Sequence, residues 1–218
     1  MQKEAESEKR CRGRPQIRSD EETKDLILDV ADDQFRKAGY AAASISMIAQ
    51  TAGVSTKTLY RLFPAKADLF SSVISKKIKN YILALDTEGA ADTPLQESLE
   101  KLLISYGRLT LSGETIAMTR LVLSESDRFP EIATIFYEQA IRKTSKAIEN
   151  WLTKRISSGQ IELDDPGAAT GMLRGMMAME PQRAVMLGQL ANIPDGEIIS
   201  RAQTCAKLFL QGCKKREL

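Results

Sequence analysis

The chain has 218 residues, of which 43% are hydrophobic and 28% are charged, and its formal net charge is +2 at pH 7. This composition is that of a globular protein with enough apolar residues to fill a core. The absence of histidine excludes a Ser-His-Asp triad, a Cys-His pair and any histidine-ligated metal. The cysteines, Cys11, Cys205 and Cys213, are odd in number and lack CxxC spacing, which argues against a disulfide framework or a zinc site. We expect neither a metal nor a cofactor.

No stretch of the chain has the pattern of a membrane span or of a secretory signal. The apolar runs are shorter than the roughly 18 residues that a spanning helix needs, and the first residues are charged. We therefore expect no contact with a membrane, reduced cysteines and a cytoplasmic location.

Residues 1–20 predict a disordered basic arm, because they contain almost no large apolar side chain and many charges. Within this arm the segment KRCRGRPQIR contains five basic residues and no acid. Its Arg-Gly-Arg-Pro core, with Arg12 and Arg14, resembles segments that lie in the narrow minor groove of A·T-rich DNA, where arginine meets an enhanced negative potential. The alternative is a solubilising tail.

Residues 21–88 predict a small helical domain. Apolar residues recur every three or four positions before Gly39, which indicates an amphipathic helix that ends there. Two short helices, capped by Ser44 and Ser55, are expected next. A longer helix is expected to begin near Lys66.

The two short helices meet the requirements of a helix-turn-helix. This motif needs a small residue on its first helix, a glycine in the turn and an apolar anchor on its second helix, and Ala49, Gly53 and Leu59 are placed accordingly. The second helix could then lie in the major groove and present its first turn to base edges. No acidic residue occurs between Asp33 and Asp68, although five basic ones do, which favours contact with a polyanion. The alternative is two packed helices with a solvated face.

Residues 89–218 predict a second, larger helical domain, which follows the boundary segment GAADT. Its first helix is expected to begin with a capping box formed by Thr93 and Gln96, with Pro94 at the first helical position. Several helices follow, and Pro181 should kink or break one of them. Because no strand pattern occurs, we predict an all-α fold of about nine helices and no sheet.

From Ile27 to Val73 the chain resembles the DNA-binding domain of the TetR/AcrR family of bacterial transcriptional regulators. The resemblance rests on ILDVADDQFRKAGY, SMIAQTAGVSTKTLYRLF and PAKADLFSSVI, in this order. The remainder, through LVLSESDRFPEIATIFYE and GQIELDDPGAAT, is similar to the regulatory domain of one AcrR-like subgroup. The resemblance implies an N-terminal three-helix helix-turn-helix domain linked to a larger helical domain for ligand binding and dimerisation.

The resemblance also implies contacts with double-stranded DNA, transferred position by position. Contacts with base edges or grooves are expected from Ser46, Thr56, Lys57 and Arg61. Contacts with phosphates are expected from Ser44, Thr58, Tyr60 and Lys66. Leu62 stands where members often have an aromatic residue or a histidine, so no contact is transferred to it.

Family members form homodimers through their last two helices, which here are about residues 166–190 and 195–213. The apolar stripe expected at this interface comprises Ile198, Ala202, Cys205, Phe209 and Cys213. The alternative is that the stripe is ordinary internal core. A dimer would place two recognition helices about 34 Å apart, one turn of the duplex, and would bind a palindromic operator.

The resemblance further implies a repressor that leaves its operator when a small hydrophobic effector enters the second domain. The candidate pocket residues are Tyr106, Met118, Arg120, Phe136, Tyr137, Trp151, Met172 and Met176, chosen because aromatic and methionine side chains form adaptable apolar walls. The alternative is that the aromatic and methionine residues belong to the core. Arg120 and Arg174 are expected either to meet an anionic ligand or to pair with Glu125 or Glu180.

Two other classes of function stay open at this point. An effector-independent, architectural DNA-binding protein would show weak sequence preference and have a filled second domain. An enzyme could use the carboxylates of Glu162, Asp164 and Asp165, but these lie where a loop and a helix cap are expected, and no partner base is evident. We therefore expect that the protein is not an enzyme.

Overall fold

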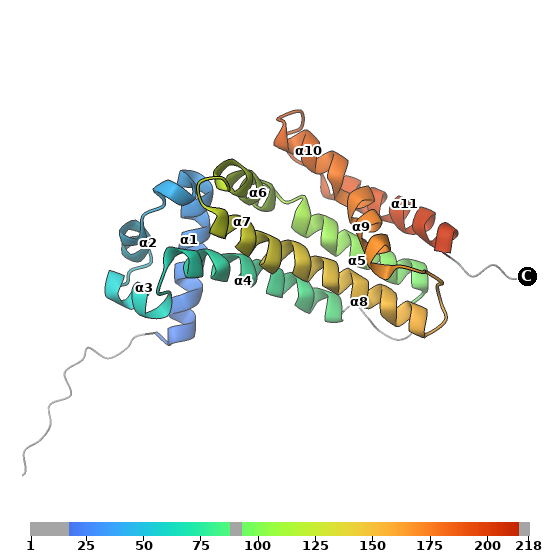
Figure 1. The fold of residues 1–218 in the computed structure, drawn as a ribbon, viewed down its shortest axis with the longest axis horizontal. Helices are drawn as coiled ribbons and strands as arrows, with labels where there is room; N and C mark the ends of the chain where they lie inside the picture. Colours follow the sequence, from blue (N-terminus) through green and yellow to red (C-terminus); the bar gives the residue numbers. More distant parts are fainter. Residues whose placement is uncertain (1–17, 88–92, 214–218) are drawn as a thin grey trace, which may run out of the picture.

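The computed structural model describes residues 18–87 and 93–213, and within these ranges the chain is helical without a β-strand (Figure 1). The predicted all-α fold is confirmed. When each π-helical stretch is counted with the α-helices that adjoin it, the described residues form nine helices. The elements are α1 (Asp20–Ala42), α2 (Ile45–Thr51), α3 (Thr56–Leu62), α4 (Lys66–Thr87), α5 (Leu95–Thr110), α6 (Gly113–Glu125), α7 (Pro130–Phe136), η1 (Tyr137–Arg142), α8 (Lys143–Ser157), α9 (Pro166–Arg174), η2 (Gly175–Met179), α10 (Glu180–Met186) and α11 (Asp195–Cys213).

The helices form an elongated molecule with α1, α2 and α3 at one end and α11 at the other (Figure 1). Helix α4 runs from the first end towards the middle, and the continuous helix α7–η1–α8 packs along it. Helices α5 and α11 pack against each other at the far end. Helix α4 therefore joins the end that carries the helix-turn-helix to the rest of the molecule.

Helix α1 begins and breaks where its sequence predicts. The Ser19 hydroxyl accepts a hydrogen bond from the backbone N–H of Glu22, and the Glu22 carboxylate accepts one from the backbone N–H of Ser19, which together form a capping box. Gly39 has φ 84° and ψ 167°, a conformation that residues with a Cβ rarely adopt. The helix is therefore interrupted at Gly39, and the last three residues of α1 follow this kink.

The predicted caps of the two short helices are confirmed. The Ser44 hydroxyl accepts a hydrogen bond from the backbone N–H of Met47 at 3.4 Å, at the start of α2. The Ser55 hydroxyl accepts one from the backbone N–H of Thr58 at 3.0 Å, at the start of α3. Each cap satisfies an N–H group that has no partner within its own helix.

A first hydrophobic core joins α1–α4 with α6 and α7. Four aromatic rings pack within it at centroid distances between 5.2 and 5.7 Å, those of Phe35, Tyr40, Phe70 and Phe129. Residues of α6 and α7 are buried in the same core, namely Met118, Leu121, Val122 and Ile132. Helices that come after the expected domain boundary therefore pack directly on the first four helices, and the boundary itself stays a prediction.

The predicted capping box at the start of α5 is wrong. Pro94 is the N-cap residue, its ψ is 142°, and it makes no side-chain cap hydrogen bond. A box centred on Thr93 would need Pro94 in the helical conformation, whereas the helix begins one residue later, at Leu95. The Gln96 side chain instead donates to Glu100, one turn along the helix, at 2.9 Å.

Two helices contain π-helical stretches, η1 and η2, that the sequence analysis did not predict. In such a stretch each N–H bonds the carbonyl five residues back, so the turn is wider than in an α-helix. Pro181 follows η2 as the second residue of α10, and the helix continues through it. Contrary to the prediction, the helix therefore does not break at Pro181. Proline has no N–H to donate, and the wider π-helical turn of η2 lies just before it, so the helix accommodates the missing hydrogen bond.

A second hydrophobic core lies between α5, α8, α9, η2 and α11. Gly107 lies at the crossing of α5 with η2 and α11, where an added Cβ would lie 2.5 Å from Cε of Met177 and 2.7 Å from Cγ2 of Ile198. Only a residue without a side chain permits this approach. Gly107 thus sets how closely α5 packs against the two elements.

Candidate nucleic-acid interface and ligand cavity

The turn between α2 and α3 has the geometry that the helix-turn-helix motif requires. Ala49 and Leu59 are buried, and Gly53 has a φ of 68°. The backbone N–H of Val54 donates to the carbonyl of Ala49 at 2.9 Å, which closes the turn. Leu59 anchors the inner side of α3 in the first core, so the opposite side of this helix faces outward.

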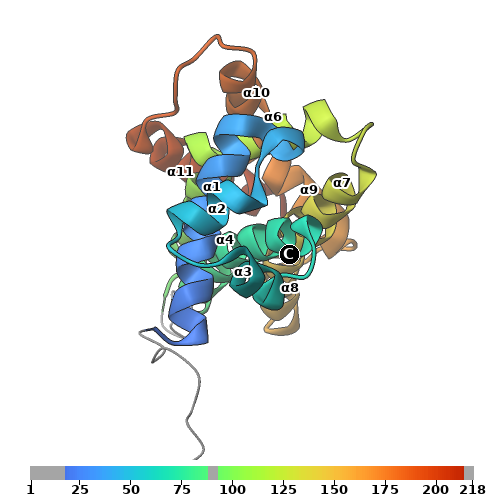
Figure 2. The ribbon, with the colours of Figure 1, turned by 90° about the vertical axis from the view of Figure 1, so that its left-hand side faces the viewer.

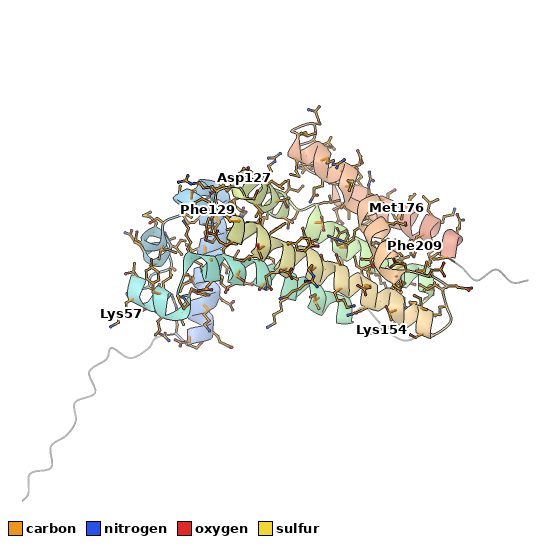
Figure 3. All side chains as sticks on the ribbon, viewed as in Figure 1. Lys57, Asp127, Phe129, Lys154, Met176 and Phe209 are labelled. Atoms are coloured by element: carbon orange, nitrogen blue, oxygen red, sulfur yellow. The ribbon has the colours of Figure 1, made fainter. Side chains whose placement is uncertain are left out.

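The predicted contact residues of α3 lie mainly on its outer side. Thr56, Lys57 and Arg61 are exposed, and the Tyr60 side chain is 50% exposed. Lys57 lies at the helix-turn-helix end of the molecule, far from Lys154 on α8 (Figure 3). Figure 2 shows the ribbon from this end, with α1, α2 and α3 towards the viewer. The hydroxyl, ammonium and phenol groups of α3 are therefore gathered on one accessible surface.

Hydroxyl groups predicted to contact DNA also take part in capping. Ser44 Oγ lies 2.8 Å from Ser46 Oγ, and Ser55 Oγ lies 2.8 Å from Thr58 Oγ1. In each pair one hydroxyl donates to the other, which leaves one O–H proton that can be donated to a phosphate oxygen. Capping and phosphate contact are therefore compatible at these positions.

Arg61 is already paired within the chain, a feature that the sequence analysis missed. Its Nη1 and Nη2 groups donate to the two carboxylate oxygens of Asp20, both at 2.8 Å. The hydrogen bond to Asp20 raises the pKa of Arg61. Asp20 is 41 residues away in the sequence and lies outside the acid-free stretch, so inspection of neighbouring residues does not reveal it. A DNA contact from Arg61 would have to share or displace Asp20.

Lys66 is partly buried and supports the end of α1. Its Nζ donates to the carbonyl oxygen of Ala41 at 3.2 Å and lies 5.0 Å from the ring centroid of Tyr40. Burial lowers the pKa of Lys66, and the charge of Glu125 partly opposes this effect. The predicted phosphate contact of Lys66 stays a prediction beside this internal role.

Arg12 and Arg14 lie outside the described residues. Their predicted contacts with the minor groove, and the predicted disorder of the basic arm, therefore stay predictions.

A cavity of about 470 Å³ lies among α4, α5, α6, the continuous helix α7–η1–α8 and the continuous helix α9–η2–α10. Three of the eight predicted pocket residues, Tyr106, Met118 and Phe136, line it. Aliphatic side chains of α4, Ile74 and Ile78, form part of the same wall. Both π-helical stretches contribute to the lining, and such stretches are frequent at functional sites. A predominantly apolar cavity of this size is typical of a small-molecule site.

Four other predicted pocket residues lie away from the cavity wall. Trp151 donates its indole N–H to the Ser98 hydroxyl at 3.2 Å, beside the second core. Met176 packs against that core as well. Tyr137 and Met172 are exposed at the surface. The core alternative therefore describes Trp151 and Met176 better than the pocket hypothesis does.

The two arginines considered for ligand binding have different surroundings. Arg120 lies outside the cavity lining and donates to the backbone carbonyls of Val185 and Met186 at the end of α10. Arg174 lines the cavity and donates to the hydroxyls of Tyr106 and Ser145, at 3.2 and 2.6 Å. Neither arginine pairs with a carboxylate among the described residues.

Comparison with known proteins identifies the family. The model for bacterial regulatory proteins of the tetR family matches residues 27–73. The model for the C-terminal domain of AefR-like transcriptional repressors matches residues 97–212, which are more than half of the chain. The chain belongs to the TetR family of transcriptional regulators.

Related proteins agree with this assignment. The uncharacterized HTH-type transcriptional regulator YhgD of Bacillus subtilis (strain 168) is 25% identical over 136 residues, which are 62% of this chain and 68% of YhgD. The fatty acid metabolism regulator protein of the same strain is 26% identical over 141 residues, which are 62% of this chain and 69% of that protein. Both relatives of the TetR-family protein are named as regulators.

Solved structures show the same fold. A TetR-family transcriptional regulator from Mesorhizobium loti has a TM-score of 0.78 at 22% identity, covering 91% of this chain and 100% of that chain. The flavonoid-responsive regulator FrrA has a TM-score of 0.71 at 27% identity, covering 90% of this chain and 100% of that chain. In the part of the TetR-family regulator that the structure describes, no helix combines the length and apolar character needed to cross a bilayer.

In this TetR-family regulator the predicted dimer stripe faces the core of its own chain. Ile198, Ala202 and Cys205 are buried in the second core, and Phe209 packs against it. This placement favours the alternative that the stripe is internal core. Other large apolar side chains of this region are exposed, namely Met172, Met179, Leu187, Leu190 and Leu208.

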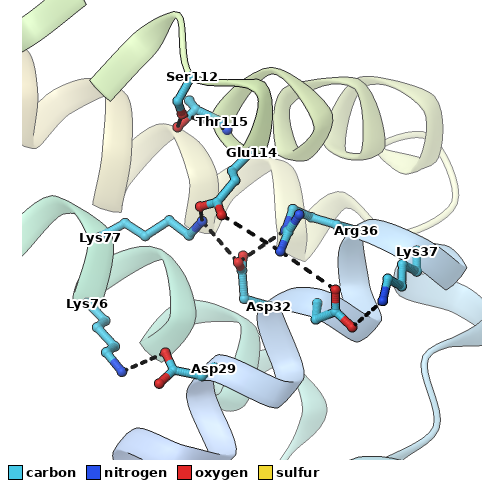
Figure 4. Close-up of polar contacts among 10 residues, drawn as sticks. Asp29, Asp32, Arg36, Lys37, Lys76, Lys77, Ser112, Glu114 and Thr115 are labelled. Carbon is cyan, nitrogen blue, oxygen red and sulfur yellow. Dashed lines mark hydrogen bonds and ion pairs between the residues drawn. The ribbon is translucent and has the colours of Figure 1, made fainter. Parts of the chain in front are cut away.

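A charged cluster joins α1, α4 and α6 next to the cavity (Figure 4). Nζ of Lys77 lies 3.0 Å from Oδ2 of Asp32 and 2.7 Å from Oε2 of Glu114. Nε of Arg36 donates to the same oxygen of Asp32 at 3.1 Å. The hydrogen bond from Lys77 lowers the pKa of Glu114. The cluster therefore ties the start of α6 to α1 through a lysine that also lines the cavity.

The other end of α6 is tied to α1 by Glu125. Its Oε1 and Oε2 accept hydrogen bonds from the backbone N–H groups of Tyr40 and Ala41, both at 2.8 Å. The kink at Gly39 directs these two N–H groups to the carboxylate and away from the helix. Helix α6, which contributes to the cavity wall, thus contacts α1 through charged residues at both of its ends.

Proposed function

We propose that this protein is a homodimeric repressor that binds a palindromic operator through α3 and leaves it when a small apolar molecule enters the cavity. The observation that carries the proposal is the outer side of α3, where Thr56, Lys57 and Tyr60 are exposed while Leu59 is buried on the inner side. A helix held in this way fits the major groove, and its first turn meets base edges.

The proposed DNA contacts divide into two groups by chemistry. Base edges and grooves are assigned to Ser46, Thr56, Lys57 and Arg61. Phosphates are assigned to Ser44, Thr58, Tyr60 and Lys66, with Arg12 and Arg14 for the minor groove. The phosphate contacts would fix the orientation of the protein on the duplex, and the base contacts would supply its sequence preference.

Dimerisation is proposed through the exposed side of the last helices. Met172 on α9, Met179 on η2 and Leu208 on α11 are large apolar residues that the chain leaves exposed. The helix α9–η2 that carries the two methionines packs against α11. Exposed apolar side chains on neighbouring helices can form the kind of patch that marks an interaction surface. This surface replaces the buried stripe as the candidate interface.

Release of DNA is proposed to follow from an effector that favours one arrangement of α4 and α6 over another. Such a shift requires different affinities for the two arrangements. Both helices line the cavity, and both hold α1, through Lys77 on α4 and through Glu125 on α6. The similar protein FrrA is named as a flavonoid-responsive regulator, which supports the proposal that a small molecule acts on this chain.

An effector-independent DNA-binding protein is the alternative function. It would have a filled second domain, and the cavity of about 470 Å³ weighs against this alternative. It would also have little preference for sequence, and its binding would disappear as salt is raised.

The experiment that tests the proposal is selection of duplexes from a random DNA pool by the full chain, at about 150 mM salt, followed by a salt titration. Lys57→Ala and Tyr60→Ala are the test variants. Lys154→Ala is the matched control, because Lys154 is exposed on α8 at a distance from α3 (Figure 3).

We expect an inverted repeat whose binding both test variants weaken and the control preserves. Because Lys57 is assigned to base edges, Lys57→Ala should also relax the sequence preference at the positions that this side chain contacts. A pool without an enriched sequence, or an inverted repeat that both variants bind like the original chain, would contradict the proposal.

A further inference from the structure

The cavity wall has an unbalanced charge. Three basic residues, Lys77, Arg174 and Arg183, line it, and among the described lining residues there is no aspartate or glutamate. The rest of the wall is largely apolar, and an apolar wall stabilises a charged group poorly. The surroundings of each basic residue therefore decide what the cavity can bind.

Lys77 is neutralised from outside the cavity. Its ammonium group lies within 3.0 Å of oxygens of both Asp32 and Glu114, which belong to α1 and α6. Two carboxylates around one ammonium leave no excess positive charge at this position. The charge of Lys77 is therefore balanced without an anionic ligand in the cavity.

Arg174 has only neutral partners. Nε donates to the Tyr106 hydroxyl and Nη1 to the Ser145 hydroxyl, while the guanidinium carbon lies 5.7 Å from the ring centroid of Tyr106. Its Nη2 group donates to no residue in the described ranges. The guanidinium is thus held in place, partly buried and without a counter-charge.

Two threonine hydroxyl groups of the wall already donate within their own helices. Thr119 donates to the carbonyl of Thr115, and Thr144 donates to the carbonyl of Ala140, both at 2.8 Å. Since these donors are used, they offer little to a ligand. Arg183, the third basic residue of the wall, is exposed to solvent, whereas Arg174 is partly buried. Arg174 is therefore the basic group best placed to bind a ligand inside the cavity.

We propose that the effector is a mostly apolar molecule with one anionic group, and that this group, a carboxylate, is held by the guanidinium of Arg174. The inference rests on the proposed function, because it assigns the chemistry of the effector that the cavity would hold. An anion would supply the missing counter-charge through charge-assisted hydrogen bonds to Nη1 and Nη2. The apolar wall would cover the remainder of the molecule.

The test compares pairs of molecules that differ only in charge. The probes are 2-naphthoate with 2-naphthylmethanol, and decanoate with decan-1-ol, and their binding to the full chain is measured by calorimetry. A carboxylate–guanidinium contact of this kind should make each anion roughly tenfold to a hundredfold tighter than its neutral partner. Arg174→Met should abolish this preference.

Three further variants separate loss of charge from loss of structure. Tyr106→Phe removes one hydroxyl partner and keeps the guanidinium, so the preference for anions should persist. Arg174→Lys keeps a positive charge and should retain part of the preference for anions. Arg142→Met is the matched control, because Arg142 pairs with Glu138 outside the cavity lining. Thermal unfolding of each variant verifies that it is folded.

Two results would overturn the inference. In the first, an anion and its neutral partner bind with equal affinity, and Arg174→Met changes neither affinity. The guanidinium of Arg174 then does not hold the effector, but the cavity could still be the effector site. If none of the four compounds binds up to its own limit of solubility, both the inference and the effector part of the proposed function are contradicted. DNA selection tests operator binding independently of either result.

Discussion

The carboxylate of Glu125, at the end of α6, accepts a 2.8 Å hydrogen bond from the backbone N–H of Tyr40 in α1. Its second oxygen accepts an equivalent bond from Ala41. A buried or half-buried N–H that loses its partner destabilises the protein, and bonds to a charged acceptor are stronger than neutral ones. Because α6 also lines the cavity, this contact is a direct link between the cavity wall and the helix-turn-helix end of the molecule.

Glu125→Gln should lower the free energy of unfolding by about 1–3 kcal/mol, because the amide accepts through one oxygen only and presents an N–H₂ group to the second backbone N–H. Urea denaturation at pH 7 measures this loss. Glu162→Gln is the control, since Glu162 is exposed and its carboxylate takes part in no hydrogen bond or ion pair among the described residues. Equal stability of the two variants would show that the link is energetically unimportant.

Gly39→Ala should destabilise the protein by about 2 kcal/mol or more, because φ is 84° and ψ 167° at this position. The added Cβ would also lie 2.6 Å from Oε1 of Glu125, so the carboxylate would have to move. Gly212→Ala, in α11, is the control: its Cβ would meet nothing within 4 Å. Thermal unfolding should separate the two variants, and a neutral effect of Gly39→Ala would contradict the geometry of the kink.

Glu114→Gln should alter the dependence of stability on pH. The hydrogen bond from Lys77 lowers the pKa of Glu114 below 4.5 in the folded chain, so the carboxylate contributes stability above pH 4.5 and loses it as the pH falls through the folded pKa. The Glu114 side chain is largely exposed, so the contribution is about 0.5 kcal/mol. Urea midpoints between pH 7 and pH 3 should therefore show the original chain and the variant converging in acid. A difference between the two proteins that stays constant from pH 7 to pH 3 would argue against the ion pair.

Leu208→Glu should weaken the dimer, because the Leu208 side chain is 58% exposed on the surface that we assign to the interface. A buried carboxylate opposite its own copy would be repelled and desolvated. Sedimentation velocity at micromolar concentration should show a shift towards monomer. Tyr137→Glu, which places the same charge at a residue that is 53% exposed on η1, should leave the dimer intact. A Leu208→Glu protein that stays dimeric would place the interface elsewhere.

The parts of the fold that the sequence predicts are those determined by nearby residues. Ser44 and Ser55 cap their helices through hydrogen bonds that span three residues, and Gly53 adopts the positive φ that its turn demands. Leu59 is buried as the apolar anchor of α3. These choices depend on local chemistry, so a single sequence is enough to predict them.

The parts that could not be predicted depend on contacts between distant residues. The stripe of Ile198, Ala202 and Cys205 is apolar whether it faces α5 or a second chain, and only the packing of α11 on Gly107 decides. Aromatic and methionine side chains line a cavity as readily as they fill a core, so residue type alone misplaces part of the cavity wall. Trp151 is an example, since it points to Ser98 in the second core.

The pairing of Arg61 with Asp20 changes how that arginine would act on DNA. A free lysine such as Lys57 releases condensed cations from the duplex when it meets a phosphate, and this release makes its contribution dependent on salt. Arg61 is already paired with the carboxylate of Asp20. A contact with DNA would therefore replace this carboxylate by a phosphate as the partner of Arg61, and Asp20 would remain close to the duplex. Arg61 would then contribute to the orientation of α3 on its site more than to the ionic component of affinity.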